Sequence, residues 1–243
     1  IRPVQVSAST YNLIKLAVYE SKQNFGFNAL IGPVVKLWHI GFKGAHVPTD
    51  EQIKEKMSLT NPADVRLDDD NQTVFLTKKG MELDLGGIAK GYIADRIRDL
   101  WHAYDVRAGI INLGGNVLFV NNSPKRVSGE WILGVQDPKK KRGNNLTTAT
   151  VHECSAVTSG TYERFLEING KKYHHIIDPK TGYPVKTHVA GVTLFTRDSV
   201  QAEIECKRLF FAGQPIPGWK NDKAGRYGAI FVYDDDSMER IGV

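Results

Sequence analysis

The stretch that decides most about this chain is MELDLGGIAKGYIAD, residues Met81 to Asp95. A short apolar run leads through the glycine pair Gly86 and Gly87 into a helical pattern that carries Lys90 near its start. Glycines let the backbone approach a phosphate, the amides of a helix N-terminus face it, and a lysine adds positive charge. The stretch therefore favours an anion-binding turn; the alternative is a glycine pair that only permits tight packing.

A second glycine pair lies in INLGGNV, residues 111–117, where Gly114 and Gly115 interrupt a predicted strand. Glycine inside a strand often marks a bulge, or a place where a ligand lies against the backbone. Both interpretations stay open for this stretch alone. Two such pairs in one small domain favour a flat ligand between them.

The third informative region is SAVTSGTYERF, residues 155–165, followed by KKYHHIIDPKTGYP, residues 171–184. In an extended segment His174 and His175 point to opposite faces, so only one of them can face a given site. Histidine is a proton acceptor near neutral pH, and Asp178 could either orient it or hold the proline turn. The spacing alone assigns no Ser-His-Asp triad.

Around these stretches, hydrophobic periodicity predicts alternating helices and strands. The polar segment 122–145, which contains PKKKR, is expected to be a solvated hairpin tip or loop. No repeat or Ser/Gly linker divides the chain, so we expect one mixed α/β domain over residues 1–243, with two interlocked lobes as the alternative. The expected helices cover 9–23, 48–57, 87–104 and 199–212, and the expected strands 73–78, 109–120, 162–168, 189–195 and 229–233.

Composition sets broad limits. The chain has 243 residues, 41% of them hydrophobic, and a net charge of +5, a mild excess that suits anionic ligands but mostly reflects solubility. Aromatic and basic residues do not alternate as in nucleic-acid-binding strands, so no nucleic acid is expected as a partner.

Two cysteines, Cys154 and Cys206, are too few for a disulfide framework. No apolar run suits a membrane span, and because Ile1 is no initiator methionine, we expect the natural protein to begin earlier.

Taken together and in this order, DLGGIAKG, INLGGNV, AVTSG and HHIIDPKTGYP resemble the successive signatures of the ApbE family, the FAD:protein FMN transferases. The upstream segment GFNALIGPVVKLW, residues 26–38, resembles a further family stretch, so the resemblance covers residues 7 to about 213. It implies an α+β fold with largely antiparallel sheets and flanking helices. It also implies a reaction in which FMN passes from FAD to a Thr or Ser hydroxyl of an acceptor protein and AMP leaves.

The resemblance also implies which residues act. His175 matches the family's catalytic position and would assist deprotonation of the acceptor hydroxyl, while His174 occupies a variable position. Mg²⁺ would bridge the phosphates, with Gly87 among its ligands. The residues expected to hold FAD are Gly86, Gly87, Lys90, Gly114, Gly115, Ser159, Gly160 and His175.

The chain departs from the family in SVQAEIECKRLFFAG, residues 199–213. Relatives usually carry there an aspartate and, four residues later, a threonine, both of them magnesium ligands; this chain has Glu203 and Lys207. Either the Lys207 side chain turns away and Glu203 still binds Mg²⁺, or the positive charge of Lys207 replaces part of the charge of the ion. A plain i,i+4 Glu-Lys pair that stabilises the helix is the third possibility. Asn28, where relatives commonly show aspartate, is a second departure.

The leading interpretation is therefore an FAD:protein FMN transferase that modifies a redox-complex subunit. Alternatives are an FAD-binding protein with weak or no turnover, and an FAD hydrolase that gives FMN and AMP. The chain contains no acceptor-like stretch, so it is not expected to flavinylate itself. By resemblance we expect an extracytoplasmic lipoprotein anchored to the membrane, with the anchor outside this chain.

Overall fold

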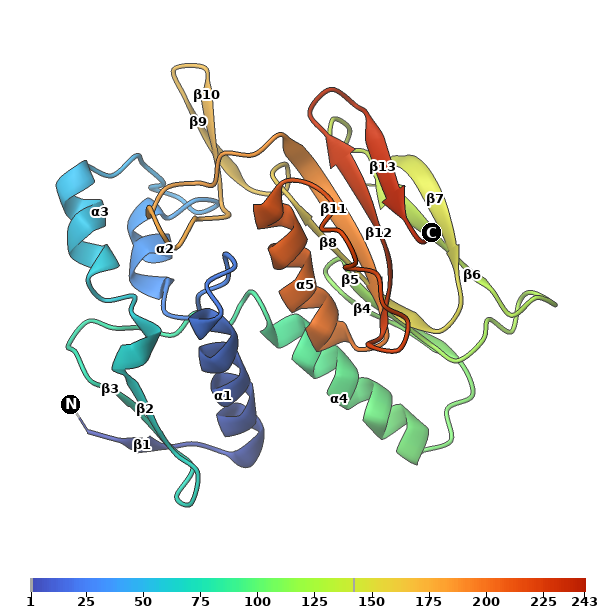
Figure 1. Ribbon diagram of the computed structural model, residues 1–243, viewed down its shortest axis with the longest axis horizontal. Coiled ribbons are helices and arrows are strands. Elements are labelled where there is room, and N and C mark those ends of the chain that lie inside the picture. Colours follow the sequence, from blue (N-terminus) through green and yellow to red (C-terminus); the bar gives the residue numbers. More distant parts are fainter. Residues whose placement is uncertain (1, 142) are drawn as a thin grey trace. The chain divides into compact units, whose positions relative to one another are not determined.

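Two units divide the chain in the computed structural model, which describes residues 2–141 and 143–243. Unit 1 comprises the residues up to Gly87 together with Glu163–Lys186, and unit 2 comprises Ile88–Tyr162 and Thr187–Val243. Each unit is thus built from two separate stretches of the sequence. Figure 1 shows the elements of both units.

Unit 1 carries three helices and two small antiparallel sheets. The strand order is β1-β3-β2 in one sheet, and β9 and β10 form a two-stranded hairpin in the other. Its elements are β1 (Val4–Gln5), α1 (Ala8–Lys22), α2 (Gly32–Trp38), α3 (Asp50–Met57), a 3-10 turn (Pro62–Asp64), β2 (Val65–Asp68), β3 (Thr73–Leu76), β9 (Phe165–Ile168) and β10 (Lys171–His174).

Side-chain caps begin the helices α1 and α3, which correspond to the helices predicted over 9–23 and 48–57. Ser7 Oγ accepts a hydrogen bond from the Thr10 amide at 3.3 Å. Thr49 and Gln52 form a capping box, in which each side chain accepts from the other residue's backbone amide. These bonds satisfy amides that a helix N-terminus leaves without partners, and both predicted helices are confirmed.

The core of unit 1 gathers around Trp38, which is fully buried at the end of α2. Its indole Nε1 donates to the carbonyl of Gly182 at 2.8 Å, and Val34, Ile53 and Ile177 pack in the same cluster. A side chain at Gly182 would place its Cβ 2.5 Å from Ile53, so the turn after Asp178 packs against α3 only because it carries glycine.

Unit 2 is built on a six-stranded antiparallel sheet of order β13-β12-β11-β8-β5-β4. A two-stranded ribbon, β6 with β7, accompanies it. Its elements are α4 (Ala89–Ala103), β4 (Gly109–Leu113), β5 (Asn116–Val120), β6 (Trp131–Gln136), β7 (Asn145–Val151), β8 (Cys154–Gly160), β11 (Val189–Thr196), α5 (Ser199–Ala212), β12 (Arg226–Tyr233) and β13 (Met238–Ile241).

The sheet of unit 2 lies between two covering layers. On one face α4 and α5 lie side by side, α4 packing Ala94 and Trp101 against Ile111 and Leu118 of the β4–β5 pair (Figure 1). On the other face the β6–β7 ribbon covers the sheet with a cluster formed by Phe119, Val135, Ala149, Val151, Cys154, Ala156, Phe195 and Ile230. Both faces of the central strands are therefore buried, which explains why every residue of β11 is buried.

Two local predictions were wrong, and a buried strand is among the elements that were not predicted. Residues 109–120 are two strands joined by a two-residue turn, with Leu113 paired to Asn116; Gly114 and Gly115 both have positive φ, 65° and 98°, as a tight hairpin turn requires. The predicted polar loop contains strand β6, whose apolar side is covered by the sheet. Residues 154–160, not predicted as an element, form the buried strand β8 between β5 and β11.

The predicted fold class is confirmed. Every strand pair in the described residues is antiparallel, and helices flank the main sheet of unit 2. Within residues 2–141 and 143–243, none of the helices combines the length and apolar character that crossing a bilayer requires.

Candidate functional site

The start of α5 is held by α4. The buried Asp95 carboxylate accepts hydrogen bonds from the amides of Ser199 and Val200, at 2.8 and 2.9 Å. One turn earlier on α4, a Cβ at Gly91 would lie 2.3 Å from the carbonyl oxygen of Ser199. Gly91 therefore allows α4 and α5 to cross closely, and Asp95 caps the start of α5. Neither role of these two residues of the GGIAKGYIAD stretch was predicted.

Glu203 is the centre of a buried polar cluster on α5. Its carboxylate, 3% exposed, accepts a hydrogen bond from Asn116 Nδ2 at 3.0 Å through Oε1 and one from Lys207 Nζ at 3.1 Å through Oε2. Lys90 Nζ lies 3.6 Å from Oε1. We call Lys90, Asn116, Glu203 and Lys207 the Glu203 cluster.

The cluster keeps Glu203 ionised. Burial raises the pKa of this carboxyl, but the charges of Lys207 and Lys90 and the hydrogen bonds from Asn116 and Lys207 outweigh it, so the pKa lies below its usual value. Two ammonium groups then face one carboxylate, and the cluster carries a net positive charge. Lys90 is 44% exposed, so part of that charge is open to a ligand.

Asn116 joins the cluster to the glycine turn beside it. Its Oδ1 accepts from Ser199 Oγ at 2.8 Å while its Nδ2 bonds Glu203, so one buried amide connects the turn, the start of α5 and the carboxylate. The Gly115 amide donates to Asn112 Oδ1 at 3.1 Å. The structure thus brings the predicted residues Lys90 and Glu203 together with the Gly114–Gly115 turn.

The remaining predicted FAD residues of unit 2, Ser159 and Gly160, end strand β8 next to β11. A Cβ at Gly160 would lie 2.4 Å from the ring of Tyr162. The glycine is therefore needed for packing in the unit itself. Its predicted role in FAD binding stays a prediction.

Gly86 and Gly87 belong to unit 1, at the end of its first stretch. The Gly86 amide donates to Asp84 Oδ1 at 2.8 Å, and the Asp84 amide donates to the carbonyl of Ala29 at 2.7 Å. An anion at Gly86 would have to compete with the Asp84 carboxylate for this amide. The predicted role of this glycine pair in FAD binding stays untested.

The adjacent histidines His174 and His175 of unit 1 have different partners. His174 uses both ring nitrogens locally: Nε2 lies 2.9 Å from the carbonyl of Val185, and Nδ1 accepts from the Ile176 amide at 3.3 Å. His175 Nδ1 lies 3.2 Å from the carbonyl of Arg164, which can only accept. Neutral His175 therefore carries its proton on Nδ1, and Nε2 is its basic nitrogen.

Asp178 holds the proline turn, one of its two predicted roles. Its Oδ1 accepts from the Lys180 amide at 2.8 Å, and its carbonyl accepts from the amides of Thr181 and Gly182. Asn28, the second departure, donates to the carbonyl of Thr60 at 2.8 Å and accepts from the Leu30 amide. An aspartate could not donate to Thr60, so this contact needs the amide.

A divalent cation does not fit the Glu203 cluster as it stands. Both carboxylate oxygens already face donors, and an ammonium group occupies the position from which a cation would bind Oε2. Within the described ranges, three or more His, Cys, Asp or Glu side chains nowhere gather as they would around a metal ion. The predicted metal role of Glu203 therefore requires Lys207 to leave.

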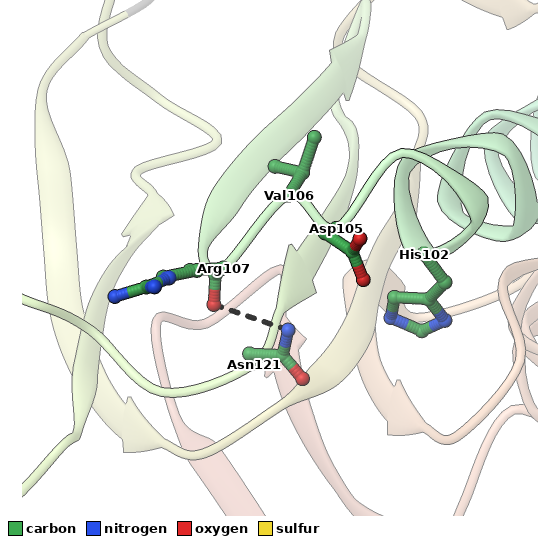
Figure 2. A pocket seen from close by; sticks show the side chains of 5 residues that line it. All are labelled: His102, Asp105, Val106, Arg107 and Asn121. Atoms are coloured by element: carbon green, nitrogen blue, oxygen red, sulfur yellow. Dashed lines mark hydrogen bonds between the residues drawn. The ribbon is translucent and has the colours of Figure 1, made fainter.

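A cavity of about 480 Å³ lies elsewhere in unit 2, between the end of α4 and the far ends of β4 and β5. Figure 2 shows its lining residues, His102, Asp105, Val106, Arg107 and Asn121, with Asn121 Nδ2 donating to the carbonyl of Arg107. It contains none of the predicted site residues. The Glu203 cluster, and not this cavity, is therefore where predicted site residues of unit 2 come together.

Sequence reasoning missed three members of the site: Asn116, Asp95 and Ser199. Asn116 directly follows the glycine pair in INLGGNV, and a polar amide residue next to a glycine pair in an apolar stretch was a usable signal. Asp95 and Ser199 are far apart in the sequence, and no local pattern indicates that one caps the other.

Relatives of known name match this chain closely. The model of the ApbE family matches residues 1–231. An FAD:protein FMN transferase of Klebsiella pneumoniae is 44% identical over 212 residues, covering 87% of this chain and 65% of the relative. One from Treponema pallidum is 38% identical over 223 residues, covering 87% and 62%.

A solved structure agrees with these matches. The ApbE protein of Thermotoga maritima superposes with a TM-score of 0.84 at 31% identity, over 98% of this chain and 77% of that one. The chain spans less than two thirds of the length of the two transferases above. With the family model matched over most of its length, the chain belongs to the ApbE family.

Proposed function

We propose that this chain is the main part of an FAD:protein FMN transferase. In the proposed reaction the hydroxyl oxygen of an acceptor Thr or Ser forms a bond to the FMN phosphorus of FAD. The bond from that phosphorus to the bridging oxygen breaks, and AMP leaves with this oxygen. The hydroxyl proton passes to a base. FAD is thus the donor substrate, and a protein is the acceptor.

The observation that carries the proposal is the 44% identity to a relative named FAD:protein FMN transferase. The Glu203 cluster adds physical support, because its net positive charge lies next to a tight glycine turn. A diphosphate carries negative charge that such a group of ammonium ions stabilises. A nucleotide diphosphate is a suitable ligand for this part of unit 2.

His175 is the proposed base. Its Nδ1 faces the carbonyl of Arg164, which fixes the tautomer whose Nε2 can accept a proton. General base catalysis of this kind contributes roughly a hundredfold or more to rate. The rest of the predicted FAD-binding set, including Gly86, Gly87, Ser159 and Gly160, belongs to this proposal as well.

Only the family resemblance indicates a magnesium ion. The ion would neutralise charge that develops on the phosphates, a role filled by oxygen ligands in a suitable site. In this chain the Glu203 oxygens face two lysines and an asparagine, so we derive no step that uses the ion. We further propose an acceptor among redox-complex subunits, and a location outside the cytoplasm on a membrane anchor.

The test is a transfer assay with FAD and an acceptor protein that carries a Thr or Ser flavinylation site. We expect covalent flavin fluorescence on the acceptor and one AMP released for each flavin attached. His175→Ala should lower the transfer rate at least about a hundredfold and leave FAD affinity nearly unchanged. His152→Ala, an exposed histidine of unit 2, is the matched control and should transfer at the normal rate.

The other outcomes identify the alternatives. AMP release without acceptor and without attached flavin would make the chain an FAD hydrolase. FAD binding with neither product would make it a carrier. A His175→Ala variant of undiminished rate would remove this histidine from the mechanism.

A further inference from the structure

The Glu203 cluster contains more positive charge than its carboxylate balances. Lys207 gives two hydrogen bonds to Glu203, one to Oε2 and one to the main-chain carbonyl, each at 3.1 Å. An ammonium group has three N–H bonds, so one remains for another acceptor. Lys207 is 18% exposed, while Glu203 is almost entirely buried.

The position of Lys207 is fixed by its surroundings. Lys207 is one helical turn after Glu203 on α5, and Glu203 is itself fixed by Asn116. Asn116 is held in turn by Ser199 at the start of the same helix. An ammonium group held this way is preorganised, because it does not have to be ordered when an anion arrives.

A metal ion and this ammonium group exclude each other. Both would contact the same carboxylate oxygen, and two cations at that distance repel each other strongly outside bulk water. The ion would therefore bind only after Lys207 had left Glu203, at the cost of the two hydrogen bonds that Lys207 makes there. The lysine is already in place and needs no such rearrangement.

We propose that the Lys207 ammonium group, held by Glu203, takes the place of a divalent cation here, so that this chain binds the diphosphate of its FAD without a metal. This inference depends on the proposed function, because it names what neutralises the donor substrate of that reaction. Lys90 supplies a second charge at the more exposed side of the same carboxylate. The two lysines act together as a metal-free anion site.

The first test measures binding in the whole chain without any turnover. FAD affinity, followed by flavin fluorescence, should change less than twofold between EDTA and millimolar Mg²⁺. Titration with Mn²⁺, followed by the electron paramagnetic resonance signal of the free ion, should show no bound ion with or without FAD. A tenfold loss of FAD affinity in EDTA that Mg²⁺ restores, or one Mn²⁺ bound per chain, would overturn the proposal.

The second test removes the charge. Lys207→Met should weaken FAD binding in EDTA about tenfold or more. Lys207→Thr frees the carboxylate and adds a hydroxyl, so it should acquire Mn²⁺ binding and an FAD affinity that rises with Mg²⁺. Lys223→Met, an exposed lysine of unit 2, should behave like the unchanged chain. Lys207 variants that stay folded and bind FAD normally in EDTA would also overturn the proposal.

The outcomes separate this inference from the proposed function. A chain that binds no FAD under any ionic condition overturns both. A chain that needs Mg²⁺ both to bind FAD and to transfer FMN retains the function and loses the inference. A chain that transfers FMN equally well in EDTA supports both.

Discussion

The side chain of Asp95 connects two helices through a single carboxylate. It accepts from two α5 amides, and Arg98 Nη1 lies 3.6 Å from the same group. Burial raises the pKa of Asp95, while the two amide hydrogen bonds and Arg98 oppose that change. A buried acceptor of two amides is costly to remove, because both donors are then left without partners.

We therefore expect Asp95→Ala to lower the free energy of unfolding by about 1–3 kcal/mol, measured by urea denaturation. Asp95→Asn keeps one oxygen acceptor and should lose less. Asp99→Ala, an exposed aspartate on the same helix, is the control and should change stability by less than about 0.5 kcal/mol. Equal losses at both positions would contradict the capping role.

The two cysteines give a pH-dependent prediction. Burial raises the pKa of the Cys154 thiol to about 12 and that of Cys206 to about 11. The thiolate is the reactive form, so reaction should be negligible near pH 8 and should rise only as the pH approaches these values. We expect no reaction with Ellman's reagent in the folded chain and two equivalents in concentrated guanidinium.

A variant with an exposed cysteine, Val127→Cys, controls this measurement and should react at once with one equivalent, because Val127 is fully exposed. Rapid reaction of Cys154 or Cys206 near pH 8 in the folded protein would mean that β8 or α5 opens easily. It would contradict the packing described for unit 2.

At the scale of the elements, the close crossing of α4 and α5 predicts that alanine at Gly91 lowers stability, although alanine normally stabilises a helix. Replacing glycine by alanine inside a helix normally stabilises it by about 1 kcal/mol. At Gly91 the new Cβ would lie 2.3 Å from the Ser199 carbonyl oxygen and 2.8 Å from Val200 Cα, both backbone atoms that cannot rotate away.

Gly91→Ala should therefore destabilise the chain by about 1–3 kcal/mol in a thermal or urea unfolding experiment. Asn12→Ala, at an exposed position of α1, should instead be neutral or slightly stabilising. A stabilised Gly91→Ala variant would show that α4 and α5 are farther apart than described.

The elements also show what the sequence could predict and why. The helices α1, α3 and α5 were predicted closely, because hydrophobic periodicity is a local signal, and at α1 and α3 local side-chain caps add to it. The β4–β5 turn was expected to be an interruption within one strand, since a glycine pair alone does not tell a turn from an irregular strand. Strand β6 was missed because its apolar side is recognisable only when the covering sheet is known.

Local motifs predicted some residues of the site, but not the contacts between distant segments that hold them in place. Motif order indicated Lys90 and Glu203, and Lys90 Nζ lies 3.6 Å from Glu203 Oε1. An i,i+4 pair of Glu203 and Lys207 was one of the possibilities that the sequence left open, and the structure shows this pair. No local pattern indicates that Asn116 of strand β5 fixes the Glu203 carboxylate. Long-range contacts of this kind leave no signature in one sequence.

At the scale of the whole molecule, unit 2 contains the complete core of its sheet. Helices α4 and α5 cover one face and the β6–β7 ribbon covers the other, all within the unit. The sequence of unit 2 is interrupted after Tyr162 and resumes at Thr187; we call the intervening residues 163–186 the excursion. At its ends, the Thr161 amide donates a hydrogen bond to the carbonyl of Ala190 at 3.0 Å. The ends of the excursion are thus close enough for a short loop to join them.

We predict that residues 88–243 fold alone when 163–186 are replaced by a short glycine-rich loop. The buried six-stranded sheet keeps both covering layers, so circular dichroism should show cooperative melting, and both thiols should stay protected from Ellman's reagent. The complementary fragment 1–87 loses Tyr173, Ile177 and Tyr183 from the cluster around Trp38, so its tryptophan should become accessible to acrylamide. Reactive thiols or non-cooperative melting in the 88–243 variant would show that the excursion is required for the fold of unit 2, and that the two units fold as one.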